Sequence, residues 1–75
     1  MVIDLIVNIE EDGFSAEVPS LKGCESWAHS EDEAIKNAVD LTRYYINLSS
    51  EIEIKIDLAR KNKNKKVYKL IFDKE

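Results

Sequence analysis

The chain has 75 residues, a length that fits one small domain, and such a domain buries only about 60% of the surface that its unfolded form exposes. Hydrophobic residues make up 44% of the chain and charged residues 35%, which indicates a soluble globular domain rather than a disordered segment. The net charge of −4 is unevenly distributed. Residues 1–58 carry 13 acidic and 4 basic side chains, whereas residues 59–75 carry 7 basic and 2 acidic ones. The acidic part repels nucleic acid and favours a basic protein partner.

Several cellular destinations are not expected from this sequence. It has no run of about 18 apolar residues, so we expect no membrane span. The N-terminal stretch lacks a basic leader and a small-residue cleavage site, so we expect no signal peptide. The single cysteine, Cys24, cannot form an internal disulfide, which is consistent with a reducing cytoplasm.

Three strands are predicted in the first 29 residues. Residues 3–9 alternate between apolar and polar side chains, which indicates a strand, and Asp12-Gly13 after them is a strong hairpin signal. The second strand ends at Pro19, which cannot donate to a ladder. Its predicted inner face consists of Phe14, Ala16 and Val18. In the third strand, residues 24–29, one face is Cys24, Ser26 and Ala28, and the other is Glu25, Trp27 and His29.

A helix is predicted from Ser30 to about Leu48. Ser30 and Glu33 form a capping-box pattern, in which each side chain bonds the other residue's backbone N–H. The apolar face of this helix covers an arc of roughly 220°, twice what one sheet requires. Either the last segment of the chain covers the excess or it is a self-association surface. The candidate self-association residues are Tyr44, Ile46 and Val39.

Two further strands are predicted after the helix. Residues 51–58 alternate strictly and place Ile52, Ile54, Ile56 and Leu58 on one face. Residues 60–66, RKNKNKK, form a polar turn before a final strand at 67–72, whose inner face is Tyr68, Leu70 and Phe72. We expect this basic loop to be a solvated hairpin tip that discourages edge aggregation, with a nucleic-acid contact as the alternative. The predicted fold class is therefore α+β, in the order β-β-β-α-β-β.

Residues 12–38, DGFSAEVPSLKGCESWAHSEDEAIKNA, resemble the signature of the HicB-like antitoxin family. The matching positions are Gly13, Phe14, Ala16, Val18, Pro19, Leu21, Gly23, Cys24, Ser30, Glu33, Ala34 and Asn37. Ala28 and Lys22 depart from the pattern, since the family often has glycine and proline there. The resemblance implies one HicB-like domain over residues 1–75. It also implies a partial ribonuclease-H-like fold, with a three-stranded meander, a helix and then a strand beside the first.

The resemblance also implies a function without catalysis. Members with antitoxin roles typically bind a small basic HicA-type toxin that cleaves messenger RNA, and this implies a homodimeric interaction protein without a cofactor. Many members add a C-terminal DNA-binding domain, but none fits after Leu58, so operator binding is not expected. The alternative is an orphan HicB-like domain with an RNA-binding or other regulatory role and no toxin partner.

Two catalytic interpretations are not favoured by the alternation of the strands. Asp4, Asp40 and Asp57 could form the metal site of a nuclease, but each lies on the polar side of its element. Cys24 and His29 could pair as nucleophile and base, but their odd spacing in one strand places them on opposite faces. One cysteine and one histidine are also too few ligands for a zinc site of the usual cysteine and histidine type within one chain.

The remaining candidate is a partner interface on the face opposite Cys24. It consists of Trp27, His29, Glu25 and Glu17. Tryptophan is enriched where protein interfaces hold most of their binding energy. We expect Trp27 to pack against the final hairpin, and a protein interface is the second alternative. Stacking on RNA bases comes third, because Glu17 and Glu25 share that face.

Overall fold

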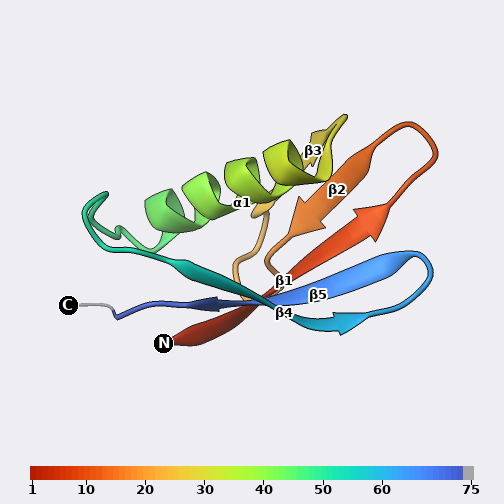
Figure 1. Cartoon of the computed structure of the whole chain (residues 1–75). Helices are drawn as coiled ribbons and strands as arrows, with labels where there is room; N and C mark the ends of the chain where they lie inside the picture. Colours follow the sequence, from red (N-terminus) through yellow and green to blue (C-terminus); the bar gives the residue numbers. More distant parts are fainter. Residues whose placement is uncertain (74–75) are drawn as a thin grey trace.

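The computed structural model describes residues 1–73, which form a five-stranded antiparallel sheet with one helix on one face (Figure 1). The strands are β1 (Val2–Ile9), β2 (Phe14–Glu17), β3 (Glu25–Ala28), β4 (Lys55–Lys61) and β5 (Lys65–Ile71), and the helix is α1 (Glu31–Tyr45). Their order across the sheet is β3-β2-β1-β5-β4. The α+β class and the predicted order of elements are confirmed.

The strand beside β1 is β5, whereas the family resemblance predicts the strand directly after the helix. β5 pairs with β1 over seven residues, from Val2 opposite Ile71 to Asn8 opposite Lys65. A short hairpin then places β4 outside β5, at the edge of the sheet. The physical reason lies in the two sequences. β5 buries Leu70 at the centre of the sheet, whereas β4 is exposed along its whole length and carries lysine and arginine, which suit an edge.

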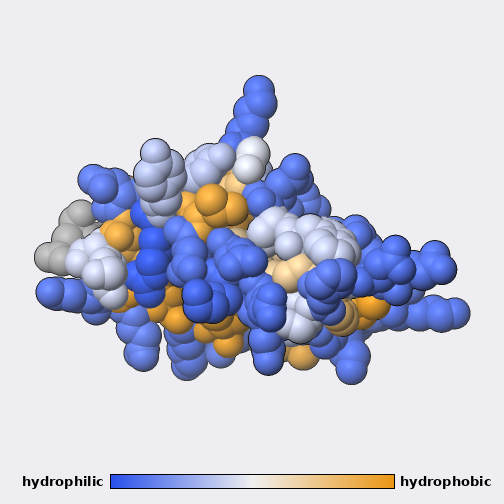
Figure 2. Space-filling model, turned by 90° about the horizontal axis from the view of Figure 1, so that it is seen from above, coloured by the Kyte–Doolittle hydropathy of each residue, from blue (hydrophilic) through white to orange (hydrophobic). Residues whose placement is uncertain are grey.

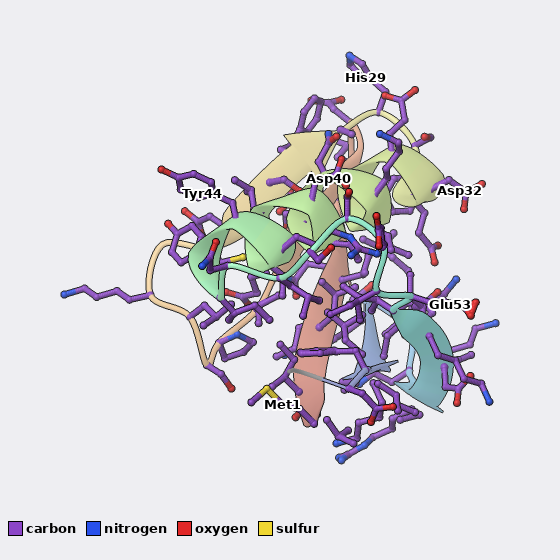
Figure 3. The ribbon with its side chains drawn as sticks, turned by 90° about the vertical axis from the view of Figure 1, so that its left-hand side faces the viewer. Met1, His29, Asp32, Asp40, Tyr44 and Glu53 are labelled. Carbon is purple, nitrogen blue, oxygen red and sulfur yellow. The ribbon has the colours of Figure 1, made fainter. Side chains whose placement is uncertain are left out.

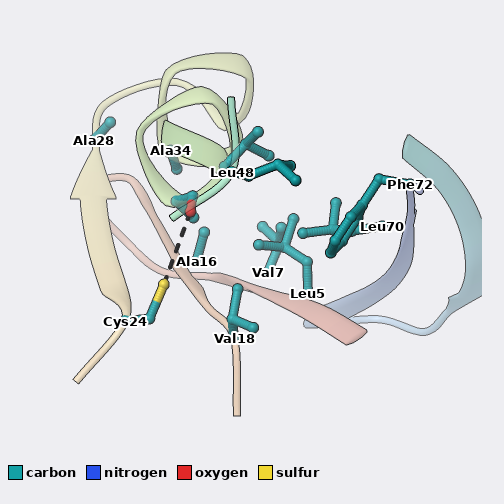
Figure 4. Packing of buried hydrophobic residues seen from close by; sticks show 12 residues of the cluster. Leu5, Val7, Ala16, Val18, Cys24, Ala28, Ala34, Leu48, Leu70 and Phe72 are labelled. Carbon is teal, nitrogen blue, oxygen red and sulfur yellow. Dashed lines mark hydrogen bonds between the residues drawn. The ribbon is translucent and has the colours of Figure 1, made fainter. Parts of the chain in front are cut away.

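The core lies between α1 and the strands beneath it (Figure 4). Leu5, Val7 and Leu70 are fully buried, as alternation predicts for the inner face of β1 and β5. Cys24 is also buried, and its Sγ donates to the Ala38 carbonyl oxygen at 3.8 Å, the dashed line in Figure 4. The predicted inner faces of the first three strands are therefore confirmed.

The helix begins where the sequence predicts and ends three residues early. The Ser30 hydroxyl accepts from the Glu33 backbone N–H at 3.2 Å, so half of the predicted capping box is present. The reciprocal bond from the Glu33 carboxylate does not form within residues 1–73. At the other end Asn47 has a φ of 55°, and the Leu48 N–H donates to the Arg43 carbonyl, which is a Schellman termination.

Residues 51–54 are not part of a strand, contrary to the prediction. Ile52 and Ile54 pack against the core as an irregular segment, and β4 starts only at Lys55. Ile56 and Leu58 keep the predicted inner side of the sheet but remain 40% and 51% exposed. The reason is that α1 lies over β1, β2 and β3 and reaches β5 only through side-chain bonds from Glu31, so β4 at the edge is left without a cover.

The wide apolar face of α1 is partly covered by its own chain. Val39 is buried and Ile46 is half-buried against the core, so these two side chains are not free to form a self-association surface. Tyr44 is 83% exposed and projects outward from the helix (Figure 3). The three predicted self-association residues therefore do not form one exposed patch. Within residues 1–73, no helix combines the length and the apolarity that crossing a membrane requires.

The two glycines have different structural roles. Gly23 has a φ of 82°, the left-handed region that glycine favours, and shapes the turn between β2 and β3. Gly13 lies in the predicted β1–β2 hairpin but does not have a positive φ. A Cβ at Gly13 would lie 2.5 Å from the Ala28 carbonyl oxygen and 2.6 Å from the Trp27 ring. Gly13 is therefore required by close packing, not by turn geometry.

Candidate functional site

The open face of the sheet, opposite α1, differs in charge between its two halves. The half formed by β2 and β3 presents Glu17, Glu25 and Trp27, and Glu10 follows β1 at the same end. The half formed by β4 and β5 presents Lys55, Lys65 and Lys69, with Asp57 among them. The charge asymmetry of the sequence thus becomes a spatial asymmetry, because the basic C-terminal hairpin lies at one edge of the sheet and the acidic strands at the other.

Trp27 packs against the β1–β2 hairpin, not against the final hairpin as predicted. Its ring lies over Gly13, and its Nε1 donates to the Glu10 Oε1 at 3.0 Å. His29 meets the ring edge-on with centroids 4.8 Å apart. The prediction was wrong because two strands separate β3 from β5 in the sheet. These contacts fix the orientation of Trp27 and leave 46% of the residue exposed.

Glu17 and Glu25 face each other across β2 and β3. Their Cα atoms are register partners, and the neighbouring pair in the ladder is Ser15 opposite Trp27. Like charges directly opposite on antiparallel strands destabilise a sheet. Within residues 1–73 neither carboxylate has an ion-pair partner. The free protein therefore holds two unneutralised negative charges next to an exposed tryptophan.

These side chains surround a shallow depression of about 520 Å³. Its lining comes from all three acidic-end strands and includes Asn8, Glu10, Ser15, Glu17, Glu25 and Trp27. We call this set the acidic face. A cationic side chain placed here would meet carboxylates and the π face of an indole, and both attract positive charge. The acidic face can thus bind a basic group, and it offers nucleic-acid phosphates only repulsion.

A comparison with known proteins places the chain in a family. A UPF0150 protein of Helicobacter pylori is 34% identical to it over 62 residues, which span 83% of this chain and 85% of that relative. The chain belongs to the UPF0150 family. No family model matches the chain, and no solved structure matches it significantly. The name UPF0150 states no activity, so the function of this member must be inferred from its own geometry.

The structure brings together most of the partner residues predicted for this UPF0150 member. Trp27, Glu25 and Glu17 share the acidic face, while His29 lies beyond β3 at its border, near the start of the helix (Figure 3). The His29 Nδ1 lies 3.4 Å from the Asp12 carbonyl oxygen, in the β1–β2 turn. Sequence reasoning missed Glu10. The alternation of β1 contained the signal, since Glu10 continues the series of open-face positions 4, 6 and 8.

The catalytic alternatives receive no geometric support. Asp4 and Asp57 lie on the open face on either side of Lys69, and Asp4 pairs with that lysine at 2.5 Å. Asp40 is on α1 and pairs with Lys36 at 3.3 Å, so the three carboxylates do not converge. Cys24 is buried and His29 is exposed, as the alternation of β3 predicts. Among residues 1–73, no three His, Cys, Asp or Glu side chains lie close enough together to hold a metal ion.

A polar cluster on the helix side joins α1 to β5 in this UPF0150 chain. The Lys66 Nζ donates to both Glu31 carboxylate oxygens at 2.8 and 3.2 Å, and the Tyr68 hydroxyl donates to one of them at 2.5 Å. These bonds, first from Lys66 and then from Tyr68, hold the pKa of Glu31 below its ordinary value of 4.5. Burial, followed by the bond to Glu31, raises the pKa of Tyr68 to about 12. We call these three residues the Glu31 cluster.

The predicted basic loop at 60–66 is a hairpin rather than a seven-residue turn. Arg60 and Lys61 end β4, Lys65 and Lys66 begin β5, and residues 62–64 make the turn. Lys66 is neutralised by Glu31, so the segment offers fewer exposed charges than the sequence suggests. Its tip lies at the same end of the molecule as the β1–β2 turn, and the N-terminus and the end of β5 lie at the opposite end (Figure 1).

Proposed function

We propose that this chain is a non-catalytic interaction protein of the HicB-like antitoxin type, and that its acidic face binds a small basic HicA-type toxin. One observation carries the proposal: Glu17 and Glu25 are opposed without a partner beside the exposed Trp27. Two carboxylates opposite each other lower the stability of the free protein. The arrangement is useful only if the protein binds a cation there.

The docking step follows from ordinary side-chain chemistry. An arginine or lysine of the toxin would stack on Trp27 and donate to Glu17 and Glu25, which removes their mutual repulsion. Trp27 is already held by Glu10 and His29, so little conformational entropy is lost on binding. The negative charge of the acidic face would also speed the encounter with a basic partner.

The resemblance of residues 12–38 to the HicB-like signature supports this assignment. The ion pairing and dispersed positions of Asp4, Asp40 and Asp57 support a role without catalysis. The alternative is an orphan domain that binds RNA, either through the basic hairpin or by stacking bases on Trp27. The carboxylates around Trp27 argue against base stacking, because they repel phosphates. A cytoplasmic location is part of the proposal, because the toxin acts on messenger RNA.

The first step of the test is to look for a gene for a small basic protein beside the gene for this chain. Co-expression of the two chains, followed by titration calorimetry, then measures binding. We expect a stable complex and an affinity that falls with salt. Glu25→Gln should weaken binding roughly tenfold, because a charge-assisted hydrogen bond contributes about 1.5 kcal/mol. The same variant should raise the melting temperature of the free protein slightly, since the like-charge pair is gone.

Glu51→Gln is the matched control, because Glu51 is exposed and far from the acidic face in the loop after α1. It should change neither quantity. A toxic basic neighbour that forms no complex would overturn the proposal, and so would a complex that Glu25→Gln and Trp27→Ala leave at full strength. Retention of RNA at low salt, without any protein complex, would favour the orphan alternative.

A further inference from the structure

Strand β4 is an open edge of the sheet. β5 pairs with one of its sides, and no strand within residues 1–73 pairs with the other. All seven of its residues are exposed, including Ile56 and Leu58 on the helix side. Figure 2, the view from above, shows that hydrophobic residues reach the surface between hydrophilic ones on this side of the molecule. An exposed edge with apolar side chains is a template for another strand.

A bulge divides β4 into two different halves. The register with β5 shifts between Leu58 and Arg60, where Ala59 is the extra residue. Beyond the bulge, Arg60 and Lys61 carry the charges that natural edge strands use to prevent pairing. Before the bulge, residues 55–58 are regular and alternate between charged and apolar side chains. Only this first half is suited to extend the sheet.

We propose that residues 55–57 of β4 pair with the same three residues of a second copy of this chain, antiparallel about a twofold axis at Ile56. Ile56 then lies opposite Ile56 of the second copy on the helix side. On the open side, Lys55 lies opposite Asp57 of the other copy, and the symmetry forms this ion pair twice. Two five-stranded sheets become one of ten strands.

The charges of β4 select this register over its neighbours. An axis at Lys55 would place two lysines opposite each other, and an axis at Asp57 would place two aspartates opposite each other. An axis at Leu58 would bring Lys55 opposite Lys61 of the second copy. A shift of the pairing by one residue would place an apolar helix-side residue opposite a charged open-side one, which the pleat forbids. The axis at Ile56 alone gives opposite charges and matched apolar side chains.

The surroundings of Ile56 favour burial on the same side. Ile56 and Tyr68 form one wall of a groove of about 470 Å³, and Ile35 and Val39 of α1 form the other. Pairing would place the two Ile56 side chains opposite each other along the rim of this groove, and each Leu58 opposite residue 54 of the other copy. The paired segment is short, so we expect an interface at the small end of the known range and a dissociation constant in the micromolar region.

The acidic face is not involved in this contact. β3 and β4 are the opposite edges of the sheet, so the dimer leaves both acidic faces free at its outer ends. The proposed dimer therefore does not rest on the proposed toxin binding, and each can fail without the other.

Disulfide trapping tests the register directly. Side chains opposite each other on antiparallel strands have Cβ atoms about 4.5–5.5 Å apart, which a disulfide can approach. Mild oxidation of Ile56→Cys should give a covalent dimer. Leu58→Cys should not, because Leu58 faces residue 54 of the second copy in this register. The wild-type chain is the control. Its single cysteine, Cys24, is buried, so the wild-type chain should stay monomeric on a non-reducing gel.

A charge exchange tests the ion pairs, with sedimentation equilibrium as the measurement. Lys55→Asp and Asp57→Lys should each weaken the dimer about tenfold, and the double variant should restore it, because it recreates both pairs with the charges reversed. Lys63→Asp makes the same charge change as Lys55→Asp in the β4–β5 turn and should leave the dimer intact. Circular dichroism should show all four variants folded.

Three results would overturn the proposal. The first is a wild-type chain that remains monomeric up to millimolar concentration. The second is a dimer that Ile56→Glu does not disrupt, which would place the contact elsewhere, for example at Tyr44. The third is that the β4 variants lose toxin binding while their dimerisation is unchanged. This result would mean that the toxin, not a second copy, pairs with β4.

Discussion

The Glu31 cluster gives a sharp prediction about stability, because three bonds join the first turn of α1 to β5. Glu31 accepts from Lys66 and Tyr68, and the side chains of Glu31 and Lys66 are each only 21% exposed. Glu31→Gln keeps the shape and removes the charge. Hydrogen bonds to charged groups contribute about 1.5–3 kcal/mol, and a neutral amide retains part of that. We therefore expect a loss of about 1–2 kcal/mol, or roughly 5–15 °C in melting temperature for a domain of this size.

The pH dependence has a definite sign. Because the folded pKa of Glu31 lies below its ordinary value of 4.5, the charged form contributes stability that is fully present above that value. This contribution is lost as the pH falls through the lowered folded pKa. The gap in melting temperature between wild type and Glu31→Gln should thus be constant above about pH 5.5 and should close in stronger acid.

Thermal unfolding followed by circular dichroism between pH 2 and 7 measures this gap. Glu33→Gln is the matched control, since Glu33 lies in the same helical turn, loses the same charge and is exposed. The control isolates the cluster from the helix dipole. Equal losses for the two variants at pH 7, or a gap that stays open in acid, would show that Lys66 and Tyr68 do not stabilise the fold through Glu31.

Three further predictions concern the fold. Gly13→Ala should cost about 1–3 kcal/mol in urea unfolding and shift the fluorescence of Trp27, since the new methyl overlaps the ring and the Ala28 carbonyl; an unchanged spectrum and midpoint would contradict the packing described. In the same assay Leu5→Ala should lower the free energy of unfolding by about 2–5 kcal/mol and Ile56→Ala by less than about 1 kcal/mol, because Leu5 is fully buried and Ile56 is not. Similar losses for the two variants would mean that β4 is covered in the monomer. In a pH titration followed by phenolate absorbance, Tyr68→Phe should remove a step near pH 12 that the wild-type chain shows. If the substitution removes a step at a lower pH instead, Tyr68 does not belong to the Glu31 cluster.

The predictions from sequence succeeded where local chemistry acts alone. The period-two patterns of β1, β2 and β3 assigned each side chain to the correct face, because successive Cβ atoms must point to opposite sides of a strand. Ser30 begins the helix because its hydroxyl satisfies a backbone donor that has no partner within the helix. The same alternation placed Trp27, Glu25 and Glu17 together, which is most of the acidic face.

The end of the helix and the start of β4 were predicted less well. Residues 51–58 alternate without interruption, yet only those from Lys55 onward join the sheet. The Schellman turn at Asn47 ends the helix, and Arg43 then donates to the Ser49 and Ile52 carbonyls at 3.0 and 2.7 Å. These bonds hold the connecting segment against the helix. An alternating pattern indicates which residues could share a face of a strand. It does not indicate at which residue the pairing with a neighbouring strand begins.

The sequence by itself determined the elements, their order and the faces of the first three strands, since each depends on neighbours within a few residues. Only the tertiary structure decided that β5, not β4, lies beside β1, that Trp27 rests on Gly13, and that Glu17 opposes Glu25. Each of these depends on which distant segments pair and in what register. Alternation allows several such pairings, and only the joint burial of apolar side chains from β1, β5 and α1 in one core selects among them.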